Sequence, residues 1–315
     1  MRVAILDDIH GAYERTNGVR RLREHAEVKI FTAPFGDPSA LAGFDAVVAN
    51  RERTRFDCAL LEQLPDLRII AQTGNHAYHI DLAAAAARSI IVAKATGGFS
   101  IGAAELAIGF AIALMRQIPS TDAAVKRGLW QTPMTPVLHG KTLGIVGLGH
   151  VGRHVAMLAR AFGMRVLAWS PRLTRESAAT VGAEPSELDA LLAAADVVSI
   201  HATLTPESRG LMDARRLGLM KPQAYLVNTA RGAIVDEAAL VAALAAERIA
   251  GAGLDVFTTE PLPSGHPLTK FPNVILTPHL GWPTDAGYAG FAENAADALL
   301  AWRDGRPVAQ FVAGH

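Results

Sequence analysis

The sequence predicts an α/β protein built from two domains, each a doubly wound parallel sheet, with one domain inserted into the other. Short apolar runs recur along the whole chain. The stretches between them are long enough for helices, which is the pattern of buried parallel strands joined by crossovers. The chain has 315 residues, half of them hydrophobic, so it can fill two separate cores. The last helical stretch, 288–304, is expected to return to the first domain.

The first domain is predicted to span 1–99 and 284–315. Its strands are indicated by short, continuous apolar runs at 3–6, 46–49, 69–71 and 90–93. A helix is expected between the last two runs. There, the alanine-rich segment 81–88 begins with an aspartate and ends with an arginine, as the helix dipole favours.

The second domain is predicted to span 100–283. It opens with a stretch, 100–116, that is almost entirely apolar or small. A helix of this composition must be buried on all sides, which places it at a domain junction or a subunit interface. Strands and helices then alternate, and this alternation predicts a doubly wound parallel sheet. The strands are expected at 142–146, 165–169, 197–200, 224–228, 253–256 and 274–276, and the helices at 151–162, 186–194 and 237–248.

Composition excludes several classes of protein. Thirty basic and thirty acidic side chains cancel, so no overall field draws the chain to nucleic acid or to a membrane surface. The single cysteine, Cys58, excludes an intrachain disulfide framework and a cysteine-based zinc site, and we expect no metal. No apolar stretch reaches about 18 residues, and the N-terminus turns acidic after four apolar residues, so neither a membrane span nor a signal peptide is expected. We expect a cytoplasmic protein.

A glycine-rich turn is the firmest functional motif. Gly147, Gly149 and Gly152 form a G-x-G-x-x-G pattern directly after an apolar strand and directly before a helical pattern. In this context the first glycine permits the tight turn and the second lets the backbone approach a pyrophosphate. The third lets the helix pack close to the strand. The turn predicts a Rossmann-type dinucleotide-binding domain, with His150 and Val151 beside the cofactor at the helix N-terminus.

The sequence leaves the choice between NAD and NADP open. An acidic residue that holds the ribose hydroxyls of NAD is expected about 20 residues after the turn, at the end of the second strand. Ser170 occupies that place, and Arg172 and Arg175 follow it. An arginine can pair with the 2′-phosphate of NADP, although both arginines can equally be solvated loop residues. The slight preference is for NADP.

Three polar residues follow three successive predicted strands, where open α/β sheets bind their ligands. Hydride transfer to or from a 2-hydroxy acid needs a cation for the carboxylate, and Arg231 offers a planar, two-pronged donor. The hydroxyl proton needs an acid/base group that works near neutral pH, which suits His279. A carboxylate that orients the imidazole is offered by Glu260. Singly, Glu260 can be a solvated loop acid and His279 a strand-end residue, so the combination carries the prediction.

Several segments look like the successive signatures of one family. They are Gly-Leu-Gly-His-Val-Gly at 147–152, Ser-Ile-His-Ala-Thr-Leu-Thr-Pro-Glu-Ser at 199–208, Asn-Thr-Ala-Arg-Gly at 228–232, Gly-Leu-Asp-Val-Phe at 253–257 with Glu260-Pro261, and Thr-Pro-His at 277–279. With these segments, nearly the whole chain resembles the D-isomer-specific 2-hydroxyacid dehydrogenases, which include phosphoglycerate, glycerate, hydroxypyruvate and formate dehydrogenases. The resemblance implies a Rossmann-type domain inserted into a flavodoxin-like substrate domain.

The resemblance also implies roles for individual residues. Arg231 would bind the substrate, His279 would be the acid/base and Glu260 would be its partner. A further set would line the cofactor, with Asp255 near the nicotinamide and His201 near the adenine: Thr229, Ala230, Asp255, His201 and Gly281. For His201 a packed strand-end histidine is the alternative.

Two loops of the first domain look like the family's substrate-facing loops. They are expected to contact the substrate through Arg51, Arg53, Thr73 and Gly74, although a surface role is an equal alternative for each arginine. The second loop departs from the commoner glycine-valine-glycine form and has Asn-His-Ala-Tyr at 75–78. Phosphoglycerate, glyoxylate, hydroxypyruvate and bulkier 2-oxo acids therefore all stay open as substrates.

The resemblance further implies a homodimer built on the nucleotide-binding domains, which would account for the apolar helix at 100–116. The short segment after the last helix predicts no C-terminal regulatory domain. A rival function stays open, because a dinucleotide-sensing binding protein of the corepressor type can keep the same three polar residues. Formate dehydrogenase is disfavoured, since the glutamine expected before the histidine is replaced by Thr277-Pro278.

Overall fold

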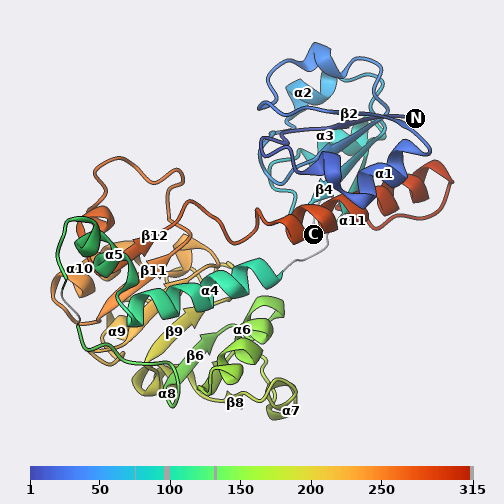
Figure 1. Cartoon of the computed structure of the whole chain (residues 1–315). Helices are drawn as coiled ribbons and strands as arrows, with labels where there is room; N and C mark the ends of the chain where they lie inside the picture. Colours follow the sequence, from blue (N-terminus) through green and yellow to red (C-terminus); the bar gives the residue numbers. More distant parts are fainter. Residues whose placement is uncertain (75, 96–99, 131–132, 313–315) are drawn as a thin grey trace. The chain divides into compact units, whose positions relative to one another are not determined.

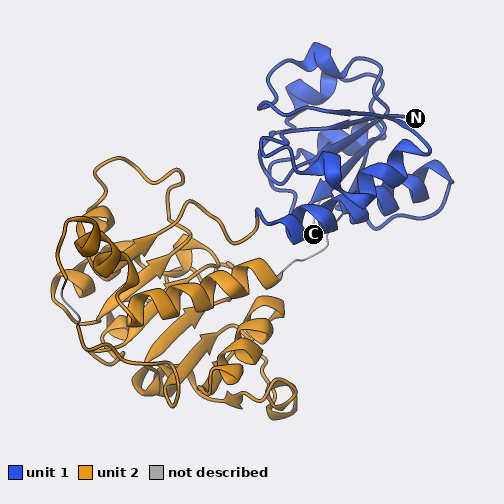
Figure 2. Cartoon of the chain, in the orientation of Figure 1, with its two compact units in different colours: residues 1–99, 283–315 blue, residues 100–282 orange. Residues whose placement is uncertain are grey.

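The computed structural model describes the chain except for residues 75, 96–99, 131–132 and 313–315. The chain divides into two compact units (Figures 1 and 2). Unit 1 comprises Met1–Phe99 and Pro283–His315, and unit 2 comprises Ser100–Trp282. Each unit holds one sheet in which every strand pairing is parallel. The predicted fold class, two α/β parts with parallel sheets, is confirmed.

The sheet of unit 1 has the strand order β2-β1-β3-β4-β5, which reverses between β1 and β3. Four of its strands coincide with the predicted apolar runs. The edge strand β2 was not predicted, because its charged residues Glu27 and Lys29 are exposed and interrupt any apolar run. The strands are β1 (Arg2–Ile5), β2 (Glu27–Ile30), β3 (Ala46–Ala49), β4 (Ile69–Thr73) and β5 (Ile91–Ala95).

Helices form two layers around this sheet. Leu61 of α2 (Cys58–Glu62) and Ala85 of α3 (Leu82–Ala87) join alternate strand residues in one apolar core. In the second layer α1 (Asn17–Arg23) packs against α11 (Asp285–Arg303), and α11 also packs on β4 and β5. Short 3-10 turns lie at Tyr13–Arg15 and Pro38–Leu41.

The contact between α1 and α11 is close enough to require glycine. A Cβ atom on Gly18 would stand 2.2 Å from the backbone carbonyl carbon of Ala292 in α11. Arg21 of α1 adds ion pairs to Glu293 and Asp297 of α11. A helix from the end of the sequence is thus an integral part of the packing of unit 1.

The sheet of unit 2 has the order β12-β11-β10-β9-β6-β7-β8, which reverses between β9 and β6. Six strands were predicted, and the two-residue edge strand β8 is the seventh. β11 starts at Gly251, two residues before its predicted position. The prediction missed this start because glycine has a low strand propensity. The strands are β6 (Thr142–Val146), β7 (Arg165–Trp169), β8 (Glu184–Pro185), β9 (Val197–Ile200), β10 (Tyr225–Asn228), β11 (Gly251–Leu254) and β12 (Val274–Leu276).

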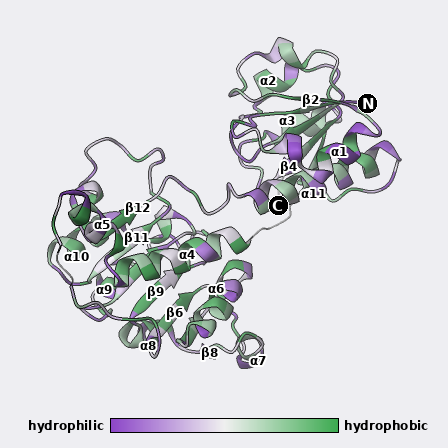
Figure 3. Cartoon of the chain, in the orientation of Figure 1, coloured by the Kyte–Doolittle hydropathy of each residue, from purple (hydrophilic) through white to green (hydrophobic). Residues whose placement is uncertain are grey.

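Helices cover both faces of the unit 2 sheet, whose strands are strongly hydrophobic (Figure 3). One core is formed with α4 and α6, and the other with α8, α9 and α10. The helices are α4 (Ser100–Met115), α5 (Ile118–Lys126), α6 (His150–Ala161), α7 (Arg175–Ala179), α8 (Leu188–Ala194), α9 (Ala214–Leu217) and α10 (Glu237–Ala245), with 3-10 turns at Gly232–Ile234 and Pro267–Lys270.

In the single chain the apolar helix is buried on one side only, so its burial on all sides, at a domain junction or a subunit interface, stays a prediction. Phe110 of α4 packs on Gly253, where a Cβ would stand 2.7 Å from its ring, but Ile101, Glu105 and Gly109 on another face are exposed. The sequence could not show this, because small and apolar residues occupy both faces of the helix. In the described part of the chain no single helix has the length and apolarity to cross a membrane, although the bent pair of α4 and α5 meets both criteria.

Candidate active site

The glycine turn joins β6 to α6. Gly147 has a φ of 102°, and a Cβ there would stand 2.4 Å from the amide nitrogen of Ala202, so this position requires glycine. A Cβ on Gly152 would stand 2.2 Å from the carbonyl oxygen of Gly147, which reflects the close helix–strand packing expected of the third glycine. At Gly149, by contrast, no atom of the described residues beyond its own neighbours in the chain lies within 4 Å of a Cβ position. A ligand can therefore approach the backbone here, beside the amide groups that open α6 at His150.

Ser170, at the end of β7, is part of this turn. Its Oγ accepts a hydrogen bond of 2.7 Å from the amide of Leu148. The sequence predicts Ser170 only as the residue that faces the ribose, because the bond to Leu148 depends on how β6 and β7 pair. Arg172 follows on the loop, with an exposed side chain.

Two buried polar atoms beyond the ends of β9 and β10 have no hydrogen-bond partner among the described residues, Nδ1 of His201 and Oγ1 of Thr229. The other ring nitrogen of His201 lies 2.8 Å from the hydroxyl oxygen of Ser199. Burial lowers the pKa of His201 to about 3, so the imidazole is neutral near pH 7. Because buried polar atoms are normally hydrogen-bonded, both atoms fit a polar ligand at this edge of the sheet.

The loop after β10 is shaped by Asn228, which sequence reasoning did not single out. Its buried side chain accepts a hydrogen bond from the amide of Ala230 and donates one to the carbonyl oxygen of Arg231, both at 3.0 Å. The guanidinium of Arg231 in turn donates to the carbonyl oxygen of Ala230 at 2.6 Å. The side chain of Asn228 thus forms an Asx turn, which fixes the backbone that carries Arg231.

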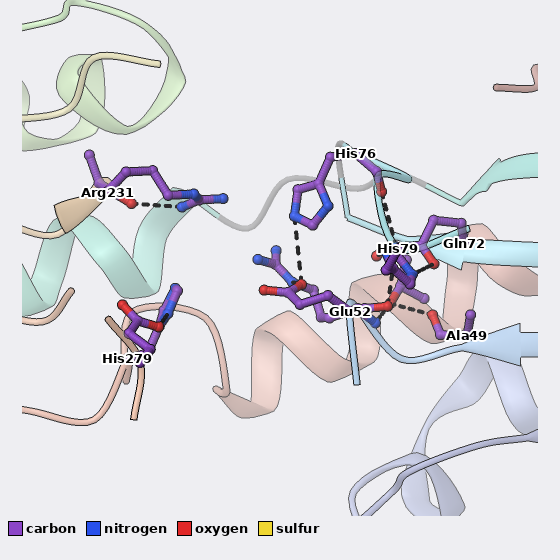
Figure 4. Close-up of polar contacts among 11 residues, drawn as sticks. Ala49, Glu52, Gln72, His76, His79, Arg231 and His279 are labelled. Atoms are coloured by element: carbon purple, nitrogen blue, oxygen red, sulfur yellow. Dashed lines mark hydrogen bonds and ion pairs between the residues drawn. The ribbon is translucent and has the colours of Figure 1, made fainter. Parts of the chain in front are cut away.

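His279 and Glu260 are in direct contact, as the sequence predicts (Figure 4 labels His279). Nδ1 of His279 lies 2.8 Å from Oε2 of Glu260, and the other carboxylate oxygen accepts a hydrogen bond of 2.9 Å from the amide of Phe257. Because a carboxylate can only accept, Nδ1 is the donor and Nε2 is left for proton exchange. The two side chains are 24% and 35% exposed, so a substrate can reach them.

Opposing effects act on the carboxyl group of Glu260. Partial burial raises its pKa, but hydrogen bonds from His279 and the amide of Phe257, together with the charge of Arg231, outweigh burial. The pKa of Glu260 therefore lies below its ordinary value, and the group is a carboxylate near neutral pH.

Gly232 brings the loop of Arg231 against the loop of Glu260. A Cβ on Gly232 would stand 2.0 Å from the backbone carbonyl carbon of Phe257, and only glycine allows this approach. The small residue that follows the arginine is thus explained by backbone contact.

Asp255 is fully buried and holds the loop that carries His279. One carboxylate oxygen accepts from the hydroxyl of Thr277 and the amide of Leu280, and the other accepts from the amide of Gly281 at 2.9 Å. His279, between these residues, has a φ of 58°, in the left-handed region that side chains rarely adopt. The carboxylate of Asp255 thus stabilises the unusual backbone that positions the histidine.

Replacing Asp255 with asparagine should therefore destabilise unit 2. The amide NH2 of Asn would face backbone N–H donors, and we expect a loss of about 1–3 kcal/mol in the free energy of unfolding, measured by urea titration. Asp189→Asn is the matched control, because Asp189 is exposed and pairs only at the surface with Arg215 and Arg216. Equal unfolding midpoints for Asp255→Asn and the wild type would contradict the role given to Asp255.

The loops after β3 and β4 of unit 1 carry the remaining predicted residues. The amide of Arg51 donates to the hydroxyl oxygen of Thr73 at 2.9 Å, and that hydroxyl donates to the carbonyl oxygen of Ala49 at 3.0 Å. Gly74, with a φ of 101°, lies against the side chain of Arg51. The guanidinium of Arg53 donates to the carbonyl oxygen of Asp7 at 2.8 Å.

The same loops contain a cluster of polar side chains around Glu52 that sequence reasoning missed. Oε2 of Glu52 lies 3.3 Å from Nε of Arg51 and 3.6 Å from Nε2 of His76 (Figure 4). Two features of the sequence could have indicated this cluster: a glutamate between two arginines, and a histidine in the atypical second loop. Asn75, in that loop, lies outside the described residues. Nowhere in the described chain do three or more His, Cys, Asp or Glu side chains form a group suited to a metal ion.

A family model for the D-isomer specific 2-hydroxyacid dehydrogenase NAD binding domain matches residues 108–281, more than half of the chain. The chain belongs to the D-isomer-specific 2-hydroxyacid dehydrogenase family. The match spans the glycine turn, Arg231, Glu260 and His279, and it supports a nicotinamide dinucleotide as the cofactor class.

Curated members of the family are similar over most of the chain. A glyoxylate reductase of Aeropyrum pernix is 42% identical over 261 residues, which cover 80% of this chain and 78% of the relative. A glyoxylate reductase of Thermococcus litoralis is 37% identical over 92% of this chain and 91% of its own length. A D-3-phosphoglycerate dehydrogenase of Synechocystis is 39% identical over 81% of this chain, but this match covers only 46% of the relative. The chain spans about half the length of the phosphoglycerate dehydrogenases it matches.

Two solved structures have the same fold as this chain. A phosphoglycerate oxidoreductase from Vibrio cholerae is 32% identical with a TM-score of 0.82, and the match covers 97% of this chain and 99% of that one. A D-lactate dehydrogenase from Lactobacillus jensenii, at 24% identity, 99% and 100% coverage and a TM-score of 0.83, shares the fold alone.

Proposed function

We propose that the protein transfers a hydride between a nicotinamide dinucleotide and a D-2-hydroxy acid or the corresponding 2-oxo acid. The observation that carries this proposal is the His279–Glu260 contact, with Arg231 on the adjoining loop, at the carboxyl edge of the sheet that bears the glycine turn. The family match to the NAD binding domain supports it independently.

The cofactor fits unit 2. The approachable backbone at Gly149 and the N-terminus of α6 suit a pyrophosphate, with His150 and Val151 beside it. The buried polar atoms of His201 and Thr229 suit the rest of the dinucleotide, along the edge that also holds Ala230, Asp255 and Gly281. The dinucleotide, when bound, supplies the hydride or accepts it.

The residues of the chain move the proton and hold the substrate. Arg231 binds the substrate carboxylate through paired hydrogen bonds, which orients the carbon at which the hydride arrives or leaves. In the reducing direction, protonated His279 gives its Nε2 proton to the carbonyl oxygen, which becomes the hydroxyl. Glu260 accepts from Nδ1 and stabilises the positive charge of the imidazolium before the transfer. In the oxidising direction, neutral His279 takes the hydroxyl proton.

The rival function is a dinucleotide-sensing binding protein without turnover. The near-ultraviolet absorbance of the reduced dinucleotide separates the two, when it is followed with a panel of 2-oxo acids including glyoxylate and hydroxypyruvate. We expect reduction of at least one of them. Tight cofactor binding without loss of absorbance for any member of the panel would favour the rival.

We propose NADP(H) over NAD(H) as the preferred cofactor, because Ser170 carries no charge to repel a 2′-phosphate and Arg172 is exposed nearby. Ser170→Asp should keep the acceptor for the amide of Leu148 while adding a charge that binds ribose hydroxyls. We expect the ratio of kcat/KM with NADPH to that with NADH to fall about tenfold or more. Arg172→Ala is the companion variant, which should lower kcat/KM with NADPH but leave kcat/KM with NADH unchanged. A wild-type enzyme with a much higher kcat/KM for NADH than for NADPH would contradict the proposed preference.

Unit 1 is proposed as the substrate domain, over residues 1–99 and 284–315, with Arg51, Arg53, Thr73 and Gly74 facing the substrate. Their position after β3 and β4 supports this, because ligands of open α/β sheets bind beyond the carboxyl ends of the strands. The glyoxylate reductases that match over most of their length make a short, unphosphorylated 2-oxo acid the first candidate.

We propose a homodimer built on unit 2. The segment after α5 exposes Trp130 by 86% and Met134 by 99%, which is unusual for large apolar side chains, and Ile101 and Gly109 leave a face of α4 uncovered. Sedimentation velocity should give a dimer at micromolar concentration. A monomer at that concentration would contradict the proposed dimer.

A further inference from the structure

Glu52 lies beside Arg51 and His76 in the loops after β3 and β4 of unit 1, where its negative charge can offset the charge of Arg51. One of its carboxylate oxygens lies 3.3 Å from Nε of Arg51 and 3.6 Å from Nε2 of His76. The side chain of Arg51 is 13% exposed and that of His76 is 19% exposed, so the three groups interact in a partly buried setting. A carboxylate this close to a shielded guanidinium offsets much of its field.

The loop that carries Arg51 is fixed. Arg51 has a φ of 60°, an unfavourable backbone conformation for arginine. Its amide donates to Thr73, and its carbonyl oxygen accepts from the side-chain amide of Gln72 at 3.3 Å. Both partners belong to the neighbouring strand β4. The strained residue is therefore held by contacts that place Arg51 and Glu52 at the end of the sheet.

The loop that carries His76 is fixed through the same glutamine. Nε2 of Gln72 donates to the carbonyl oxygen of His76 at 3.2 Å, and its Oε1 is 3.1 Å from Nε2 of His79 (Figure 4). The ring of His76 stacks on Tyr78 with 4.5 Å between ring centroids. Glu52 thus joins two preorganised loops, each anchored on the buried Gln72.

The other charged groups of this region have partners of their own. Arg53 donates to the carbonyl oxygen of Asp7 and approaches His10 at 3.4 Å. The carboxylates of Asp7 and Asp8 accept from the loop backbone and Thr54. Among these contacts, Glu52 is the carboxylate that pairs with Arg51. The pair lies at the end of β3, next to the point where the strand order reverses, and sheets of this kind bind ligands there.

We propose that Glu52 determines substrate specificity, so that the enzyme favours 2-oxo acids with an uncharged substituent and rejects those that carry a phosphate. This inference rests on the proposed function. A phosphate dianion that bound the terminal nitrogens of Arg51 would lie beside the Glu52 carboxylate, which already contacts Nε of the same guanidinium, and like charges in contact oppose binding strongly. A hydrogen or a hydroxymethyl group on the oxo acid meets no such repulsion.

The test compares hydroxypyruvate with its phosphate ester, 3-phosphohydroxypyruvate, in steady-state assays of the full chain with the reduced dinucleotide. The wild type should favour hydroxypyruvate in kcat/KM by about tenfold or more. In Glu52→Gln the efficiency with the phosphate ester, relative to hydroxypyruvate, should rise about tenfold. The matched control is Glu27→Gln, which removes a similar Arg–Glu pair at 3.2 Å at the amino end of the sheet and should leave the ratio unchanged.

A binding measurement keeps this inference separate from the dehydrogenase proposal. Calorimetric titration of the protein loaded with the reduced dinucleotide, which cannot oxidise a hydroxy acid, gives the ratio of affinities for glycerate and 3-phosphoglycerate without turnover. Glu52→Gln should improve 3-phosphoglycerate binding selectively. If neither oxo acid is reduced, the dehydrogenase proposal fails while the calorimetric ratio still decides the role of Glu52. A wild type that prefers the phosphate ester, or equal ratios in wild type and Glu52→Gln, overturns the inference. Glu52→Ser replaces Glu52→Gln if circular dichroism shows that the latter does not fold.

Discussion

Replacement of His279 with alanine should lower turnover by about two to four orders of magnitude while binding of the dinucleotide persists. The variant removes the only proton carrier assigned to the substrate oxygen, whereas the glycine turn lies on a different part of the sheet. Steady-state kinetics measure the loss, and the fluorescence of the bound reduced dinucleotide measures the affinity. A variant with a nearly normal rate would remove His279 from the mechanism.

Two further variants separate catalysis from folding. Because His279 has a φ of 58°, His279→Asn is the safer replacement, since asparagine tolerates the left-handed region better than alanine. His266→Ala is the matched control, because His266 also pairs with a glutamate, Glu237, at 3.2 Å in the same unit. We expect His266→Ala to keep the wild-type kcat.

Replacement of Arg231 with lysine should lower kcat/KM for 2-oxo acids by about a hundredfold. The charge is retained, but an ammonium group cannot make the two parallel hydrogen bonds that align a carboxylate. The loss should fall mainly on KM if the arginine only binds the substrate, and also on kcat if it aligns the reacting carbon. Affinity for the dinucleotide should change little.

The control for Arg231→Lys is Arg165→Lys, which alters a surface pair with Glu184 at the amino end of β7. A second measurement uses the substrate. When the methyl ester of a 2-oxo acid replaces the free acid, the wild type should lose most of its advantage over Arg231→Lys. An advantage that persists with the ester would show that Arg231 does not act on the carboxylate.

Features encoded by adjacent residues could be predicted from the sequence. The glycine turn is one, because the strand before it, the glycines and the helix after it are contiguous. The contact of His279 with Glu260 could also be predicted, although the two residues are distant in sequence, because parallel strands place their carboxyl ends at one edge of the sheet. The roles assigned to these residues stay predictions, but the geometry on which they depend is present.

Contacts that depend on strand order could not be predicted. The bond from Leu148 to Ser170 exists because β6 pairs with β7, and the strain at Arg51 is supported by a neighbouring strand. Asp255 is predicted to lie near the cofactor, but its contacts with the loop of His279 could not be predicted, because they follow from the pairing of β11 with β12. No periodicity encodes such pairings. The edge strands β2 and β8 were missed because edge strands with exposed residues lack the apolar run of a central strand, and both residues of β8 are exposed.

The dependence of unit 1 on α11 has a consequence for biosynthesis. Residues 1–99 leave the ribosome before unit 2, but the helix that packs on α1, β4 and β5 is made only after the whole of unit 2. Unit 2 is continuous in sequence, so its core can close during translation, as domains commonly do. Residues 1–99 are therefore made before unit 2 but are packed against α11 only after it, and until then they expose the apolar surface that α11 later covers. The nascent chain needs protection from aggregation mainly at that surface.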